Sequence, residues 1–155
     1  MNKIRLTKEQ VIPKIKQYCA YQERAHKEVK DKLYEYGLYK KEVEEIISTL
    51  IQENYLNEER FAIQYAGGKF RMKQWGKQKI KYSLKQKQVS DYCIRKALNA
   101  IDDEQYVSAL NKLAELKLKT LKSEKNIFIK KRKLQDHLLQ KGYELDLVRD
   151  IIKEI

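Results

Sequence analysis

The chain has 155 residues, and its 34 lysines and arginines outnumber 22 aspartates and glutamates, which gives a formal net charge of +12. One proline, five glycines and two cysteines exclude a collagen, a low-complexity chain and a disulfide scaffold. No apolar run could span a membrane, and no signal-peptide core follows Met1, so we expect a cytoplasmic protein with no membrane partner. Cys19 and Cys93 are then expected to be reduced, partly buried thiols.

The spacing of apolar residues predicts helices along almost the whole chain. Apolar side chains return every three or four positions, and glycine and proline are too rare for a β-rich chain with many turns. One pattern occurs three times with identical internal spacing, and its copies start 51 and 54 residues apart. In chain order, the copies are Val29, Leu33, Gly37, Leu38, Val43, Ile46, Ile47 and Leu50; Ile80, Leu84, Gln88, Val89, Ile94, Ala97, Leu98 and Ile101; and Leu134, Leu138, Gly142, Tyr143, Val148, Ile151, Ile152 and Ile155.

Each copy is typical of two helices joined by a turn, and a further helix is predicted before each pair. In the first repeat, Thr7 and Gln10 are candidates for a capping box, and Pro13 either kinks the first helix or marks its beginning. The first helices of the other two repeats are predicted to be capped by Asn57 and by Asp102 or Asp103. Glycine ends the first helix of a pair at positions 37 and 142, whereas Gln88 needs a different C-cap.

Together these elements predict an all-α fold of three tandem three-helix repeats that form an elongated, curved array. The repeats are expected at residues 1–56, 57–101 and 102–155. A repeat of this size is marginally stable alone, so stacking on its neighbours allows each to bury more apolar surface. Such arrays bind partners along one long face.

The charge is unevenly distributed along the chain. Residues 60–90 contain nine basic residues and no acidic one, and residues 117–133 contain eight basic residues opposed only by Glu124. Residues 28–59, by contrast, contain nine acidic and four basic residues. This polarity indicates an anionic partner, such as nucleic acid or an acidic protein surface, for the second and third repeats.

Lysines dominate the predicted binding surface of the second repeat. Lys77, Lys81 and Lys85 lie four residues apart, so we expect them to point outward while Ile80 and Leu84 pack inward. Trp75 is the best candidate among the aromatic residues for stacking on a base, although packing between repeats is the more common use of such residues. The residues expected to contact a partner are Arg71, Lys73, Trp75, Lys77, Lys79, Lys81, Lys85, Lys87, Lys131 and Lys133.

No constellation typical of an enzyme is present. His26 and His137 lack the spacing of metal ligands and are expected to be ordinary surface residues. A phosphate-binding loop ending at Gly76 is excluded, because Arg71 stands where glycine is required and Gln78 where serine or threonine is required. We expect no catalytic residue, metal or cofactor.

The remaining glycines have structural interpretations. Gly67 and Gly68 are expected to end or loosen the helix that begins near Asn57. Gly76 is expected to permit close packing at the start of the next helix.

The motifs of the first two repeats resemble those of the bacterial regulatory protein RecX. The matching residues are Gln22–Ala25, Glu28, Val29, Lys32, Leu33 and Gly37, followed by Tyr55–Ala62, Tyr65, Gly76, Lys79, Ile80, Leu84 and Lys87. The chain departs from the family's pattern at Gln88, where glycine is usual, and at Asn57 and Glu58, where an acidic pair is more common.

The resemblance implies a protein of three tandem three-helix repeats that binds the RecA recombinase, usually as its filament on single-stranded DNA, and inhibits its ATPase and strand-exchange activities. It also implies contacts with DNA, single-stranded and in some cases double-stranded, and no catalytic residue or cofactor. We expect a monomer. Two alternatives stay open: a helix-turn-helix protein that binds duplex DNA without RecA, and a scaffold whose tyrosine-rich acidic first repeat binds another protein.

Overall fold

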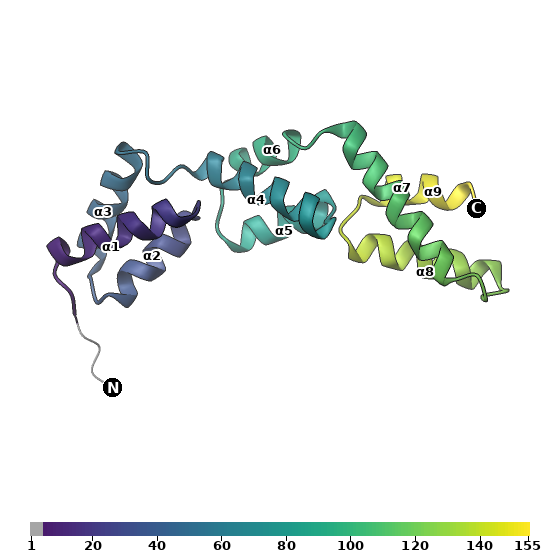
Figure 1. Cartoon of the computed structure of the whole chain (residues 1–155), viewed down its shortest axis with the longest axis horizontal. Helices are drawn as coiled ribbons and strands as arrows, with labels where there is room; N and C mark the ends of the chain where they lie inside the picture. The colour runs from purple at the N-terminus through teal and green to yellow at the C-terminus, as the bar shows by residue number, and fades with distance from the viewer. Residues whose placement is uncertain (1–4) are drawn as a thin grey trace. The chain divides into compact units, whose positions relative to one another are not determined.

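The structure is a computed structural model that describes residues 5–155. Over these residues it contains nine α-helices and no strand (Figure 1). The helices are α1 (Lys8–Tyr21), α2 (His26–Glu35), α3 (Lys40–Gln52), α4 (Glu58–Lys73), α5 (Lys77–Gln86), α6 (Asp91–Asn99), α7 (Asp103–Thr120), α8 (Ile127–Gln140) and α9 (Leu145–Lys153). The prediction of an all-α chain of tandem three-helix repeats is confirmed.

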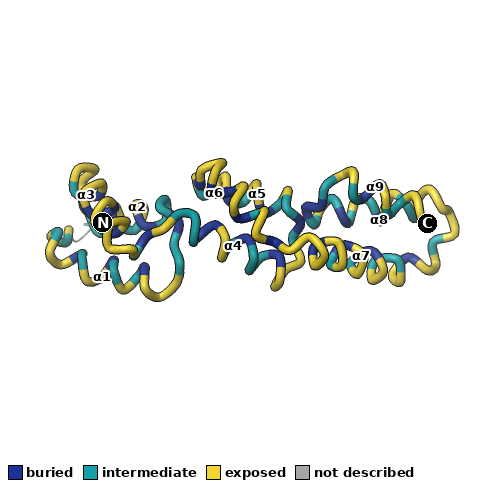
Figure 2. Tube along the Cα trace, turned by 90° about the horizontal axis from the view of Figure 1, so that it is seen from above, coloured by how far each residue is buried: buried dark blue, intermediate teal, exposed yellow. Residues whose placement is uncertain are grey.

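The chain divides into two compact units. The first comprises the residues up to Gln64 together with Leu84–Lys96, and the second comprises Tyr65–Ser83 and Ala97–Ile155. The division passes through α4, α5 and α6. The first unit therefore contains the whole of α1–α3, and the second contains the whole of α7–α9, each with a part of the three divided helices. Along most helices, buried and exposed stretches alternate (Figure 2), as amphipathic helices require.

The core of the first unit lies between α1, α2 and α3. It contains the apolar positions that the repeat pattern selects in these helices, together with Val11, Ile15 and Cys19 of α1. The capping box of α1 is present, because the Thr7 hydroxyl accepts a hydrogen bond from the Gln10 amide at 3.2 Å and the Gln10 side chain accepts one from the Thr7 amide at 2.9 Å. The helix thus begins at Lys8, and the alternative that it begins at Pro13 is wrong.

The same left-handed turn follows the second helix of each repeat. Gly37 and Gly142 have φ angles of 90° and 100°, and Gln88 has a φ of 61°. Gln88 therefore adopts the conformation that glycine adopts in the other two copies, although a side chain makes it less favourable. The backbone pattern is thus conserved between the repeats where the residue type is not.

The helix α4 does not end at its two glycines. It continues through Gly67 and Gly68 to Lys73, so the expectation that these residues end the helix is wrong. Ala62, Ala66 and Phe70 are buried one turn apart. Their packing keeps this stretch helical despite the low helix propensity of glycine, as tertiary contacts commonly do.

The core of the second unit is built on aromatic rings. The ring centroid of Tyr106 in α7 lies 5.8 Å from that of Phe70 in α4 and 5.1 Å from that of Tyr143, which precedes α9. Leu134 and Leu138 of α8 are also fully buried. These contacts join the end of α4 to the third repeat, so they fix the segment that carries the predicted binding residues.

Candidate nucleic-acid and protein interface

The start of α5 is held against the turn between α8 and α9 by backbone hydrogen bonds. The Gly76 amide donates to the Lys141 carbonyl at 2.7 Å, and the Gln78 amide donates to the Gly142 carbonyl at 2.9 Å. A Cβ atom on Gly76 would lie 2.3 Å from the carbonyl carbon of Gly142. The expectation that Gly76 permits close packing is therefore confirmed, and no residue with a side chain fits there without movement.

Two tyrosines complete this junction. The Tyr106 hydroxyl accepts a hydrogen bond from the Lys77 amide at 2.8 Å and donates to the carboxylate of Glu144. The Tyr143 hydroxyl donates to the Gln74 carbonyl at 3.1 Å. Burial raises the pKa of Tyr106, with the Glu144 carboxylate adding to the effect, and burial raises the pKa of Tyr143 to about 12. This role could not be predicted, because nothing in the local sequence relates these tyrosines to α5.

Lys77 is engaged within the second unit. Its Nζ lies 3.9 Å from Oδ1 of Asp103, and its side chain is only 21% exposed. The same Nζ lies 4.7 Å from the ring centroid of Tyr106. The expectation that Lys77 points outward is thus wrong, because the first turn of α7 supplies a carboxylate and an aromatic ring that hold the ammonium group.

Trp75 is also surrounded by lysines. The ammonium groups of Lys69 and Lys79 lie 4.9 Å and 4.8 Å from its ring centroid. Trp75 itself is half-buried. The structure therefore brings together two of the predicted residues, Trp75 and Lys79, and adds Lys69, which the sequence analysis did not select.

The remaining predicted cations of the second unit differ in their exposure and in whether they form an ion pair. Arg71, Lys73 and Lys81 are exposed, and none of them forms an ion pair with a residue that the structure describes. Lys131 is half-buried, also without such a pair. Lys133 lies 3.3 Å from the carboxylate of Glu124. The unpaired cations are therefore the stronger candidates for contact with an anionic partner.

Lys85 and Lys87 belong to the first unit. Lys85 is exposed, as expected from its place on α5. The Nζ of Lys87 lies 3.9 Å from Oε1 of Glu28, which also accepts a hydrogen bond from the Ala25 amide at 3.1 Å. Lys87 thus has a partner in the first repeat.

The first turn of α8 presents apolar side chains to solvent among basic residues. Phe128 is 81% exposed, and Ile127 and Ile129 are each 43% exposed. The cations nearest in sequence that form no ion pair with described residues are Lys122, Lys125, Lys130, Lys131 and Arg132. Phe128 was not among the residues predicted to bind a partner. Its sequence nevertheless indicated exposure, because Ile127, Phe128 and Ile129 are consecutive apolar residues that precede the buried positions Leu134 and Leu138.

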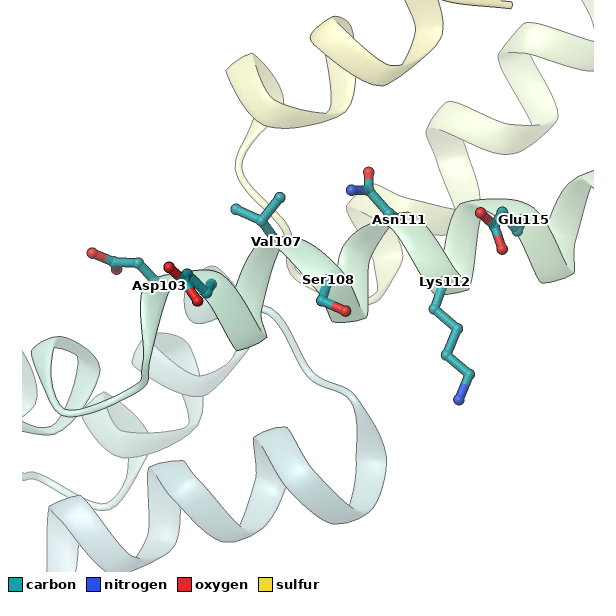
Figure 3. A pocket seen from close by; sticks show the side chains of 7 residues that line it. Asp103, Val107, Ser108, Asn111, Lys112 and Glu115 are labelled. Carbon is teal, nitrogen blue, oxygen red and sulfur yellow. The ribbon is translucent and has the colours of Figure 1, made fainter.

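The outer side of α7 has the opposite charge. A hollow of about 780 Å³ lies along it, lined by Asp103, Glu104, Val107, Ser108, Asn111, Lys112 and Glu115 (Figure 3). Three carboxylates and one ammonium group make this surface unfavourable for phosphates. This hollow is therefore not a candidate site for nucleic acid.

The expectation that His26 is an ordinary surface residue is wrong. Its side chain is 28% exposed, and its Nδ1 lies 3.8 Å from Oε2 of Glu58 in the first unit. Burial lowers the pKa of His26, Lys30 lowers it further, and Glu58 opposes this change. Burial likewise lowers the pKa of His137, with Lys117 and Lys141 adding to the effect.

The lowered pKa of His26 predicts a loss of stability in acid. Because the folded state binds the proton less tightly than the unfolded state, the unfolding free energy is expected to fall as the pH drops below about 6.5. Replacing His26 with Gln should reduce that slope, as measured by urea unfolding at several pH values. An equally steep slope in the variant would show that other groups, such as His137, cause the loss.

Residues 5–155 contain no group of three or more histidine, cysteine, aspartate or glutamate side chains arranged to hold a metal ion. Cys19 and Cys93 are buried free thiols, and burial raises the pKa of Cys19 to about 11. Such thiols are poor nucleophiles, because little thiolate is present at neutral pH. In the described part of the chain, no helix is both long and apolar enough to cross a membrane.

Comparisons with known proteins identify similar sequences and folds. Residues 57–98 match the family model of the second three-helix domain of RecX, and residues 103–152 match that of the third. The regulatory protein RecX of Clostridium tetani is 35% identical over 133 residues, which are 85% of this chain and 61% of that protein. That of Clostridium perfringens strain 13 is also 35% identical over 133 residues, and the match covers 62% of its length. The chain therefore spans about three fifths of these relatives.

Solved structures show the same similarity. The crystal structure of RecX from Lactobacillus salivarius superposes with a TM-score of 0.85 at 30% identity, and the match covers 95% of each chain. A second crystal structure, of a regulatory protein RecX, superposes with a TM-score of 0.84 over 96% of this chain and 72% of the other. At 22% identity, this second likeness concerns the fold alone.

Proposed function

Because this chain belongs to the RecX family, we propose that it is a non-enzymatic regulator that binds RecA and its filament on single-stranded DNA and lowers the ATPase and strand-exchange activity of the recombinase. It acts through contacts with the recombinase, and contacts with DNA assist. In this way it modulates recombination and repair of DNA in the cytoplasm.

The observation that carries this proposal is the set of unpaired cations on α4 and α5. Arg71, Lys73 and Lys81 are exposed and lack a carboxylate partner among the described residues, in a segment without any acidic residue. A nucleoprotein filament is strongly anionic, so it attracts such a surface and releases counterions on binding. The hydrogen bonds between Gly76 and the third repeat hold the end of α4 and the start of α5 in place.

The alternative is a helix-turn-helix protein that binds duplex DNA without the recombinase. The exposed Phe128 and the basic residues around it favour contact with nucleic acid but carry no information about the recombinase. Preference for one duplex sequence, with no effect on RecA, would support this alternative. A contact made through phosphates alone would instead weaken steeply with salt and show little sequence preference.

The first test is the ATPase activity of the cognate RecA on single-stranded DNA. We expect less than one copy of this chain per recombinase to lower the rate of ATP hydrolysis. An unchanged rate at every ratio would contradict the proposal.

A variant with fewer cations tests the surface itself. We expect replacement of Arg71, Lys73 and Lys81 with Ala to weaken binding to single-stranded DNA at least about tenfold and to reduce the slope of log K against log salt by about 2. Lys77 is left in place, because its replacement would also break the ion pair with Asp103. Fluorescence anisotropy of a labelled oligothymidine measures both quantities, and the ATPase assay shows whether inhibition weakens as well.

The matched control removes the same charge from the first repeat. Lys14, Lys30 and Lys41 are exposed and form no ion pair with described residues. Their replacement with Ala should leave DNA binding within about twofold of the original, apart from the general loss of charge. Equal weakening in the two variants would show that net charge alone, and not a surface at α4 and α5, governs binding.

We further propose that the repeats begin and end near residues 1–56, 57–101 and 102–155, and that the protein is a monomer without a cofactor. Sedimentation equilibrium tests the oligomeric state.

A further inference from the structure

A cleft of about 450 Å³ opens between the end of α4 and one side of α7, within the second unit. Phe70, Leu113 and Leu116 supply its apolar lining, and Arg71 and Lys112 supply two positive charges. Two glutamines, Gln74 and Gln105, add amide groups that can donate or accept hydrogen bonds. No acidic residue lines the cleft, in contrast to the hollow of Figure 3.

The two cations are available to a ligand. Neither Arg71 nor Lys112 forms an ion pair with a residue that the structure describes, and both are exposed. The guanidinium of Arg71 lies over Gly67, where an added Cβ would be 2.7 Å from Nη1. The absence of a side chain at Gly67 thus lets Arg71 lie along α4. In Figure 3, Lys112 extends from α7 away from Val107 and Asn111.

The lining favours a peptide over a nucleic acid. Proteins that bind single-stranded nucleic acids commonly stack bases on exposed aromatic rings, but the only ring that lines this cleft, Phe70, is 8% exposed. Leu116, by contrast, is 49% exposed and offers aliphatic surface that an apolar side chain of a peptide can cover. A cleft of this volume holds a few side chains, and a ligand with both an apolar group and carboxylates complements it.

We propose that this cleft binds an acidic, amphipathic segment of a protein partner, which places an apolar side chain on Leu113 and Leu116 and its carboxylates toward Arg71 and Lys112. The inference goes beyond the proposed function, since it assigns a particular cleft and the chemical class of the segment that binds there, neither of which the proposed function names. It holds whichever protein supplies that segment, and its test requires no recombinase.

The probe is a short, fluorescein-labelled, acetylated peptide in which leucines one helical turn apart are separated by glutamates. We expect the full chain to bind it at least about tenfold more tightly than a peptide with serine in place of leucine, because an apolar side chain is buried. A third peptide, with glutamine in place of glutamate, should also bind at least about tenfold more weakly, because the charge-assisted contacts are lost. Fluorescence anisotropy at physiological salt measures all three.

Two pairs of variants locate the site. Leu116→Gln should weaken binding of the probe about tenfold, whereas Val107→Gln on the opposite side of α7, 45% exposed, should leave it unchanged. Lys112→Ala should weaken binding severalfold, and Lys119→Ala, also exposed on α7, should not. All four side chains are at least partly exposed, so a thermal melt by circular dichroism should confirm that each variant folds.

Several outcomes would overturn the proposal. The cleft is not a peptide site if Leu116→Gln binds the probe like the original chain, or if the serine and leucine peptides bind equally well. Oligothymidine should also be tested as a competitor of the probe. If it displaces the probe, and if Lys112→Ala weakens this displacement while Leu116→Gln does not, the cleft binds nucleic acid. Failure of the probe to bind would refute the inference. It would leave the proposed function untouched, because inhibition of RecA is measured in a separate assay.

Discussion

Gly76→Ala is expected to destabilise the second unit by about 3 kcal/mol, the upper end of the range for inserting an atom into a close-packed site. The new Cβ would lie 2.3 Å from the carbonyl carbon of Gly142 and 2.4 Å from the Tyr143 amide nitrogen. Both are backbone atoms, so they cannot rotate away as a flexible side chain would. The φ angle of Gly76 is not positive, and the effect is therefore steric.

Urea unfolding followed by tryptophan fluorescence measures this change. Trp75 is the only tryptophan of the chain and belongs to the second unit, so its emission reports on the affected part. If the start of α5 moves away from the α8–α9 turn to make room for the new Cβ, the hydrogen bonds from Gly76 and Gln78 to that turn also break. A decrease in the unfolding free energy of less than about 1 kcal/mol would show that the backbone at this junction shifts at little cost.

Gly68→Ala is the matched control. An added Cβ at Gly68 has no atom within 4 Å other than its chain neighbours and the backbone of its own helix, and the residue lies inside α4. Alanine favours a helix over glycine, so this variant should be stabilised by about 0.5–1 kcal/mol. The same substitution in the same unit should thus have opposite effects at the two positions, and destabilisation at both would contradict the steric explanation.

Ile80→Asp is expected to cost at least about 4 kcal/mol and to unfold the middle repeat. Ile80 is fully buried in α5, so the variant loses apolar burial and places a carboxylate where no partner is available. Because burial favours the protonated form, the penalty should shrink as the pH falls toward the raised pKa of the new carboxyl group. Circular dichroism and Trp75 fluorescence at neutral and acidic pH measure both effects.

Lys81→Asp provides the comparison for a charge change next to Ile80. Lys81 is exposed, so its replacement should alter the stability by no more than about 0.5 kcal/mol. It should nevertheless weaken DNA binding, because a cation of the proposed surface becomes an anion. An Ile80→Asp variant that unfolds at the same urea concentration as Lys81→Asp would show that α5 does not pack through Ile80.

The sequence by itself determined the all-α class, the threefold repeat and the N-caps of the first helix in each repeat. Thr7, Asn57 and Asp102 cap their helices through bonds to amides three residues away, and such local bonds are visible in residue order. The threefold apolar pattern likewise follows from helical geometry alone. The uneven distribution of charge along the chain was equally apparent, because it follows from counting the acidic and basic residues of each segment.

Only the tertiary structure decided which basic residues stay free. Lys77 meets Asp103 and Lys87 meets Glu28 through the packing of helices that are distant in the sequence. Lys81, on the same helix, meets no carboxylate among the described residues. The closeness of Gly76 to Gly142 and the cleft between α4 and α7 arise in the same way. Ion pairs, close approaches and clefts depend on the distance between side chains of different helices, and that distance is set by how the helices pack rather than by periodicity along one chain.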